Sequence, residues 1–447
     1  MRRFFLNNLL DWKENPDRKA LLVRGARQVG KTYLIRELGK TFSNFLEINF
    51  EMDQTTANFF NGSLDPVQIV EKLSLYYGTP IVAGKTLLFF DEIQSCPQAL
   101  RSLRFFYEKM PKLHVVSAGS LLEFALAQIP SFGVGRIESL FLYPMTFFEF
   151  LAALGEGQLI DYIKSSSFEK PIDDTIHIKI LELFHKYQII GGLPASVKYY
   201  AKHRNMLGSQ KILDDLITTL TDDFAKYKKH ISMDKMSEVF RSIALQNGSK
   251  FVYSRISSER SANYKTALEM LVSAGLVYKI FHTSARGIPL GATINESKFK
   301  AAMFDTGVLQ KVSGLDLGHF IAESDFVNRG GLSELSVSLA LAASGLPHRR
   351  PELYYWHREQ RGSSAEVDFV IAIDDRIIPI EVKSGTKGAM QSMFKFLEER
   401  NCRLGIRISA ENFIKYGSIG VIPIYAAENL VNIIKNNIFF PVLRTSI

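Results

Sequence analysis

The chain contains the octapeptide Gly25-Ala26-Arg27-Gln28-Val29-Gly30-Lys31-Thr32, which matches the pattern G-x-x-x-x-G-K-[ST] at every fixed position. An apolar run over 21–23 precedes it, and a helical pattern over 33–38 follows it. Strand, glycine-rich turn and helix in this order let backbone N–H groups and a helix amino terminus converge on phosphate oxygens. The octapeptide therefore predicts an ATP site in which Lys31 reaches the β and γ phosphates and the Thr32 hydroxyl binds Mg²⁺.

A second motif, Leu87-Leu88-Phe89-Phe90-Asp91-Glu92, reads as a buried strand that ends in two carboxylates. Asp91 is expected to help hold the Mg²⁺ ion, and Glu92 to polarise the attacking water. Two carboxylates after a strand can also be an ordinary helix start. Together with the octapeptide, however, they predict hydrolysis as well as binding.

Two weaker signals belong to the same expected site. Ser120 follows the next apolar run, over 114–117, and could sense the γ-phosphate, although it could equally cap a helix. Arg136 could act as an arginine finger, in its own chain or toward a neighbouring copy. The alternative for Arg136 is a solvated arginine on a loop.

The fold class is α/β. Residues 20–150 alternate short apolar strands, expected at 21–23, 45–50, 86–90 and 114–117, with amphipathic helices. This alternation is typical of a parallel sheet covered on both faces. We expect a P-loop domain over 1–150 and, because the strand signal then disappears, a helical lid over 151–209.

The second half predicts two further domains. Over 210–300, helices at 236–246 and 264–274 and a strand at 276–281 precede the hairpin-like Arg286-Gly287, which is the winged-helix order; a helical spacer is the alternative. Over 301–447, an apolar-faced helix at 332–343 precedes alternating strands, which predicts another α/β domain.

Composition limits the function classes. Two cysteines, Cys96 and Cys402, exclude a disulfide scaffold and a cysteine-rich zinc site and favour the cytoplasm. No run of eighteen apolar residues occurs, so we expect no membrane helix. The net charge of +8 permits a polyanionic partner such as DNA. Candidate contacts, each also readable as a solvated face, are Arg349, Arg350, Lys226, Lys228 and Lys229.

A hairpin register places two carboxylates of the last domain together. If Asp374-Asp375 is a two-residue turn, facing residues sum to 749, so Asp368 faces Glu381 and Glu366 faces Lys383. Such pairs lie about 4.5–5.5 Å apart and repel when both are charged. A second Mg²⁺ or Mn²⁺ bound by Asp368 and Glu381 would remove the repulsion, with Lys383 activating a water. A solvated polar face is the alternative.

These motifs resemble a family of bacterial and archaeal AAA+ ATPases. The resemblance extends over nearly the whole chain and is carried by residues 25–32, 87–92, 119–120, 135–136, 142–147, 187–194, 304–307, 366–370 and 378–385. It implies an AAA-type P-loop domain, a helical and winged-helix middle, and a carboxyl-terminal domain of the restriction-endonuclease-like PD-(D/E)xK class. In that class an acidic residue on a preceding helix joins the site, and Glu334 is the matching position.

Three functions follow as hypotheses. The first is an ATPase that couples hydrolysis to DNA binding or metal-dependent DNA cleavage. The second is a nucleotide-gated switch whose nuclease-like domain only binds a partner, and the third is a winged-helix regulator that binds ATP without turnover. A homo-oligomer is compatible with all three.

Overall fold

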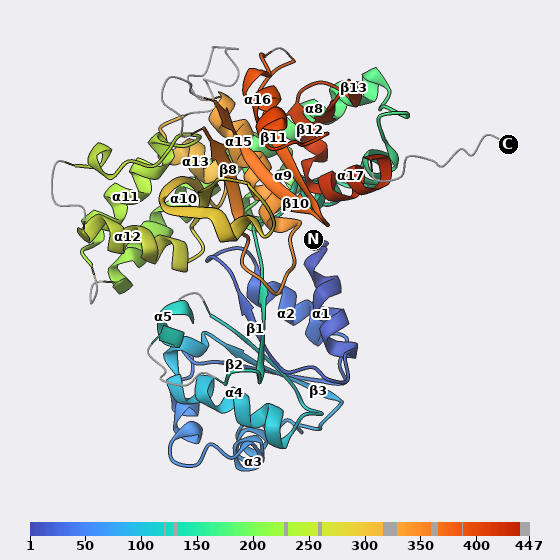
Figure 1. Cartoon of the computed structure of the whole chain (residues 1–447). Helices are drawn as coiled ribbons and strands as arrows, with labels where there is room; N and C mark the ends of the chain where they lie inside the picture. The colour runs from blue at the N-terminus through green and yellow to red at the C-terminus, as the bar shows by residue number, and fades with distance from the viewer. Residues whose placement is uncertain are drawn as a thin grey trace.

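The computed structural model describes residues 1–119, 122–127, 133–227, 231–257, 262–315, 329–358, 365–386 and 388–438. Figure 1 shows the amino-terminal sheet and its helices as one body, with the helical, middle and carboxyl-terminal segments gathered on one side of it. Within the described ranges, no helix is long and apolar enough to cross a bilayer.

The amino-terminal body is a parallel sheet of strand order β2-β3-β4-β1-β5. Its elements are α1 (Phe5–Glu14), β1 (Ala20–Arg24), α2 (Lys31–Gly39), β2 (Asn44–Asn49), α3 (Pro66–Tyr77), β3 (Thr86–Asp91), α4 (Pro97–Lys109), β4 (His114–Ala118), α5 (Leu122–Ala127) and β5 (Ile137–Phe141). All four predicted strands are confirmed. The fifth, β5, was not predicted, because its mixed sequence Ile-Glu-Ser-Leu-Phe suits an edge strand that is largely half-buried.

Both faces of this sheet are covered, as the continuous apolar strands predicted. Along β1, Leu21 and Val23 pack into one core, whereas Leu22 packs into a second core on the opposite face. Along β3, Phe89 and Phe90 divide in the same way. The carboxyl ends of β1, β3 and β4 therefore share one edge of a rigid sheet.

Five helices follow: α6 (Phe147–Leu154), α7 (Gly157–Ser165), α8 (Asp174–Ile190), α9 (Pro194–His203) and α10 (Met206–Asp222). The first of these helices, α6, has clear local signals at both ends. Thr146 and Glu149 form a reciprocal capping box at its start, and Gly155 closes it in the left-handed conformation at φ +82°.

The middle segment contains the one-turn 3-10 helix η3 (Asp223–Tyr227), α11 (Met233–Leu245), α12 (Ala262–Ser273), β6 (Val277–Thr283), β7 (Ile294–Met303) and α13 (Thr306–Val312). Both predicted helices and the predicted strand are confirmed. The expected domain boundary at residue 300 falls inside β7, and the sheet β7-β6-β8-β9 joins strands from both sides of it.

The last segment comprises α15 (Arg329–Ala343), β8 (Leu353–His357), β9 (Glu366–Val367), β10 (Phe369–Ile373), β11 (Arg376–Val382), α16 (Gln391–Glu399), β12 (Gly405–Ser409), β13 (Ile414–Tyr416), β14 (Ile419–Pro423), the 3-10 helix η6 (Ile424–Asn429) and α17 (Leu430–Ile438). Its second sheet is mixed, in the order β10-β11-β12-β14-β13. The predicted hairpin register is confirmed from Ile373 opposite Arg376 to Phe369 opposite Ile380.

Candidate functional site

The P-loop turn lies between β1 and α2, and the backbone geometry requires both of its glycines. Gly30 precedes α2 at φ +93°, a left-handed conformation that glycine adopts without strain. A Cβ on Gly25 would lie 2.2 Å from the backbone oxygen of Leu142, so a larger residue there would displace the turn. The sheet edge and the turn thus hold the amino terminus of α2 open toward an anion.

The Lys31 side chain folds back over this turn. Its Nζ donates to the carbonyl oxygens of Gly25, at 2.9 Å, and Ala26, at 2.8 Å. Burial lowers the pKa of Lys31 to about 8, although the charges of Glu92 and Asp91 oppose the change. A buried ammonium group held by neutral carbonyls is suited to receive phosphate oxygens.

Thr32 and Asp91 meet at the end of β3. The Thr32 hydroxyl donates to Asp91 Oδ2 at 3.2 Å, and the Asn49 side-chain amide donates to the same oxygen at 3.3 Å. Burial, followed by the neighbouring charge of Glu92, raises the pKa of Asp91. A hydroxyl and a partly desolvated carboxylate are suitable Mg²⁺ ligands beside phosphates, so these residues fit the predicted ion.

Glu92 is held in an unusual conformation next to this pair. Its φ is +48°, and its carboxylate accepts a hydrogen bond of 2.6 Å from the Gln94 side-chain amide. A Cβ on Gly119 would lie 2.1 Å from Gln94 Oε1, so the glycine at the end of β4 makes room for Gln94. Strained residues of this kind concentrate at active sites.

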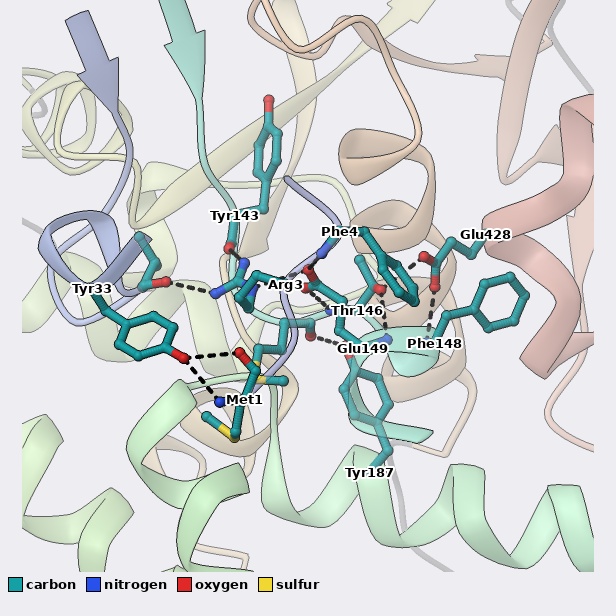
Figure 2. A network of polar contacts seen from close by, with 12 residues as sticks. Met1, Arg3, Phe4, Tyr33, Tyr143, Thr146, Phe148, Glu149, Tyr187 and Glu428 are labelled. Carbon is teal, nitrogen blue, oxygen red and sulfur yellow. Dashed lines mark hydrogen bonds and ion pairs between the residues drawn. The ribbon is translucent and has the colours of Figure 1, made fainter. Parts of the chain in front are cut away.

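A small apolar cavity of about 190 Å³ is lined in part by Gly30 of the P-loop. Its lining includes Met1, Arg3, Tyr33 and Pro194. Figure 2 shows the Tyr33 hydroxyl against the backbone oxygen of Met1, at 3.1 Å. The cavity adjoins the P-loop and has an aromatic wall, so it is suited to a planar, largely apolar group.

Arg3 joins the start of the chain to the P-loop (Figure 2). It is buried, and it donates to Val29 O at 2.8 Å, to Tyr143 O at 2.7 Å and to Glu149 Oε1 at 3.0 Å. No local sequence pattern indicates this role of Arg3, since its partners lie 26 to 146 residues away along the chain.

Glu428, from η6, reaches the amino terminus of α6 in the same network (Figure 2). Thr146 Oγ1 donates to Glu428 Oε1 at 2.8 Å, and Phe148 N donates to Oε2 at 3.1 Å. Burial raises the pKa of Glu428 to about 7; the charge of Glu149 adds to this, whereas Lys164 opposes it. The carboxyl-terminal segment therefore contacts the capping box through a titratable group.

This contact predicts a pH-dependent stability. Because the folded state binds the Glu428 proton more tightly than the unfolded state, Glu428 contributes stability below pH 4.5, which is lost as the pH rises through 7. Between pH 8 and pH 6, thermal unfolding should show a gain about 1 kcal/mol larger for the wild type than for Glu428→Gln. Because the other titrating carboxylates are the same in both proteins, their contributions to stability cancel in this comparison. An equal gain in stability in both proteins would contradict the assignment of the raised pKa to Glu428.

The loop 191–194, between α8 and α9, is hydrogen-bonded both to the residues just before α6 and to the turn after β7. Met145 N donates to Gly192 O at 2.7 Å, and Gly192 N donates to Asp305 Oδ2 at 2.6 Å. The other oxygen of Asp305 accepts from Val308 N at the start of α13. The loop that ends at Pro194, in the cavity beside the P-loop, is thus hydrogen-bonded to the strand-to-helix turn after β7.

The middle segment also touches the P-loop directly. A Cβ on Gly275, which follows α12, would lie 3.2 Å from Ala26 N. Arg27 of the P-loop forms an ion pair with Asp223 of η3. Both contacts join the P-loop to the middle segment.

Other predicted residues lie elsewhere. Arg136 forms an ion pair with Glu108 on α4 and is about half exposed, so within its own chain it does not reach the P-loop. Arg350 pairs with Glu123 of α5 at 2.7 Å, whereas Arg349 is exposed. Ser120, Lys228 and Lys229, together with the side chain of Lys226, lie outside the described residues.

The structure corrects the predicted carboxyl-terminal site. The β10–β11 ladder stops at Phe369, and Asp368 Oδ2 accepts a hydrogen bond of 2.7 Å from Val382 N. Lys383 pairs with Glu381 at 2.7 Å. Glu366 does not face Lys383, because β9 pairs with β8 and places Glu366 opposite His357.

The carboxylates nevertheless form one cluster, with a member that the sequence analysis missed. Lys300, on β7, contacts Glu334, Glu366 and Asp368. Burial, then the charge of Asp368, raises the pKa of Glu334 to about 8 and that of Glu381 to about 7. Across the described residues, no group of three or more His, Cys, Asp or Glu side chains is arranged to hold a metal ion. The predicted second Mg²⁺ or Mn²⁺ does not fit this arrangement, because Lys300, Lys383 and Val382 N already engage oxygens of Asp368 and Glu381.

Family models match three consecutive parts of the chain. Residues 17–151 match an AAA domain, residues 181–318 match a domain of unknown function (DUF8612), and residues 329–427 match another domain of unknown function (DUF4143). The first match supports an AAA-type ATPase domain that binds nucleotide through its P-loop. No curated protein sequence matches the chain.

Solved structures give distant matches. A STAND signal-transduction ATPase with a tetratricopeptide repeat sensor, from Pyrococcus horikoshii, matches at 13% identity and a TM-score of 0.26, over 75% of this chain and 45% of that one. PCH-2 of C. elegans matches at 13% identity and a TM-score of 0.28, over 45% and 62%. Cdc6p from Pyrobaculum aerophilum matches at 11% identity and a TM-score of 0.24, over 69% and 92%. The chain thus spans about half the length of the first of these relatives, and matches this distant carry no function.

Proposed function

We propose that the chain is an ATPase that binds ATP with Mg²⁺ at the P-loop and hydrolyses it with Glu92 as the residue that polarises water. The observation that carries this proposal is the convergence of Lys31, Thr32 and Asp91 at one end of the sheet, with Glu92 adjacent. Thr32 and Asp91 are the residues that would hold Mg²⁺, and the ion would supply neutralising charge at the phosphates.

The cavity beside Gly30 is the proposed place of the adenine base. Its lining combines Gly30 of the P-loop with Tyr33 and Pro194. An aromatic ring and a proline ring offer the flat apolar surfaces that a base requires. The loop 191–194 would then contact the base directly. Hydrogen bonds through Asp305 would connect this loop to the start of α13.

The carboxyl-terminal half is proposed to bind a partner under the control of nucleotide state. Arg27 and Gly275 give the middle segment a direct contact with the phosphate-binding turn. DNA is the proposed partner, on the basis of the positive net charge and the winged-helix order of elements. We do not extend the proposal to cleavage, because Lys300 and Lys383 engage the carboxylate oxygens that a metal ion would need.

Phosphate release from ATP tests the proposal as a whole. The purified chain should release phosphate with Mg²⁺ and lose this activity when EDTA removes the ion. ATP binding without turnover under all conditions would instead favour the regulator hypothesis. If hydrolysis rises steeply with protein concentration, an oligomer in which Arg136 leaves Glu108 and reaches a neighbouring site becomes the natural explanation.

DNA binding should be strongly salt-dependent, because each neutralised phosphate releases counterions. Arg349→Ala should weaken binding and lower the slope of log K against log salt by about 0.9, the value for one lost contact. Fluorescence anisotropy between 50 and 200 mM salt, about the range in which such contacts are lost, measures both quantities. Lys72→Ala, an exposed lysine on α3, is the matched control and should leave the slope unchanged. Absence of binding to duplex or single-stranded DNA at low salt would exclude DNA as the partner.

A further inference from the structure

The Lys300 side chain enters the carboxyl-terminal carboxylate cluster from β7. Its Nζ lies 2.8 Å from Glu366 Oε1, 3.2 Å from Glu334 Oε2 and 3.8 Å from Asp368 Oδ1. Lys300 is only 3% exposed. One ammonium group therefore stands among three carboxylates that come from α15, from β9 and from the bend between β9 and β10.

The ammonium group remains charged in this position. Burial opposes its charge, but the carboxylates of Glu334, Asp368 and Glu366 outweigh burial and raise the pKa of Lys300. A buried cation of this kind is stable only because it is paired, and here three partly buried carboxylates lie within 4 Å of the ammonium group. The cluster and the lysine thus depend on each other.

A divalent cation would need the same oxygens. Mg²⁺ keeps oxygen ligands at about 2.0–2.1 Å and demands near-octahedral geometry, whereas here Lys300 already occupies the space between Glu334 and Asp368. The second oxygen of Asp368 is engaged by Val382 N, and Glu381 Oε1 by Lys383. A doubly charged ion would be repelled by the resident ammonium group at close range.

We propose that Lys300 is a built-in substitute for a metal ion: its ammonium group neutralises the cluster, ties β7 to the carboxyl-terminal domain and excludes divalent cations. Glu381 Oε2 is buried and, among the described residues, has no hydrogen-bond partner. The cluster thus retains an oxygen that Lys300 does not reach. Removing the ammonium group should therefore open a cation site that the wild type lacks.

The test is Mn²⁺ binding to the full chain without nucleotide, followed by electron paramagnetic resonance. Wild type and Asp368→Asn should give the same binding isotherm, since the P-loop residues are common to both. Lys300→Met, of similar length and without charge, should gain one site that binds at least about tenfold more tightly, and Lys300→Met/Asp368→Asn should lose it. Lys250→Met is the matched control, because Lys250 is 3.9 Å from Glu366 and 39% exposed, and it should gain no site.

Two outcomes would overturn the proposal. One is an Mn²⁺ site in the wild type that Asp368→Asn abolishes, and the other is a folded Lys300→Met protein without a new site. If Lys300→Met does not fold, the comparison of wild type with Asp368→Asn still decides. Because no nucleotide is present, failure here leaves the proposed ATPase activity untouched, and a loss of ATP turnover leaves this proposal untouched.

Discussion

ATP affinity should fall by about two orders of magnitude in Lys31→Ala. The Lys31 ammonium group is buried, so a phosphate that replaced the carbonyls of Gly25 and Ala26 would form charge-assisted hydrogen bonds with little competition from water. Hydrogen bonds to charged groups contribute about 1.5–3 kcal/mol each, and a loss of about 3 kcal/mol corresponds to a factor of more than 100. Titration calorimetry with ATP and Mg²⁺ measures the change.

A second lysine, at the opposite end of the same helix, provides the control. Lys40 caps the carboxyl end of α2, and its exposed side chain pairs with Glu37. Lys40→Ala removes one positive charge from the far end of α2 and should leave ATP affinity within a factor of about two, as expected for an exposed ion pair. Equal losses in both variants would mean that Lys31 acts through net charge rather than through contact.

The depressed pKa of Lys31 gives the wild type a further property. Lys31 is protonated below about pH 8 and loses its proton above it, so ATP affinity should fall by up to tenfold per pH unit above that value. Bound phosphate would raise the pKa again, which limits the range of the effect. Titrations from pH 7 to pH 9.5 measure this decline, and affinity that stays constant would indicate that Lys31 is not the phosphate ligand.

The sequence predicted the features that depend on neighbouring residues. The P-loop and its flanking strand and helix involve a few consecutive residues, whose types decide the local conformation. The hairpin register of β10 and β11 followed in the same way, from a two-residue turn and an alternating pattern. Short-range geometry of this kind leaves few alternatives.

The features that could not be predicted depend on distant partners. The arithmetic that placed Glu366 opposite Lys383 assumed that the hairpin continued, whereas β9 leaves it to pair with β8. Lys300 sits 66 residues from Glu366 and 34 from Glu334 along the chain, in a strand assigned to another domain. Arg3 reaches 140 residues to Tyr143. Such contacts come from packing, and a single basic residue in a charged chain gives no signal of them.

Asp305 shows how a motif can be visible while its role is not. The segment 304–307 was noticed as part of a resemblance, but its spacing carries no chemistry. In the structure, Asp305 is buried, its pKa is raised to about 6 by burial, and it accepts from Gly192 N and Val308 N. Its function is to join two loops, which only the assembled fold reveals.

Glu92→Gln should bind ATP like the wild type and hydrolyse it about 10²–10⁴ times more slowly, the usual contribution of a general base. The substitution keeps size and polarity, and Thr32 and Asp91 remain in place to hold the ion. The Glu92 carboxylate accepts a hydrogen bond from Gln94, and the Glu92 backbone has φ +48°. The position of the carboxylate is therefore fixed before nucleotide arrives. A fixed carboxylate beside the phosphate ligands is what the polarisation of water requires.

The control for Glu92 is its own neighbour. Gln94→Ala leaves the carboxylate chemically intact but removes the group that orients it, so turnover should fall less, by about tenfold, while ATP affinity stays unchanged. Single-turnover phosphate release and equilibrium ATP binding, measured on both variants, separate chemistry from affinity. If Glu92→Gln hydrolyses ATP at the wild-type rate, another group must polarise the water. Of the two carboxylates at the end of β3, only Asp91 would then have a role, through its contact with Thr32 and the ion. If instead Glu92→Gln loses affinity together with turnover, Glu92 supports the nucleotide site itself rather than the attacking water.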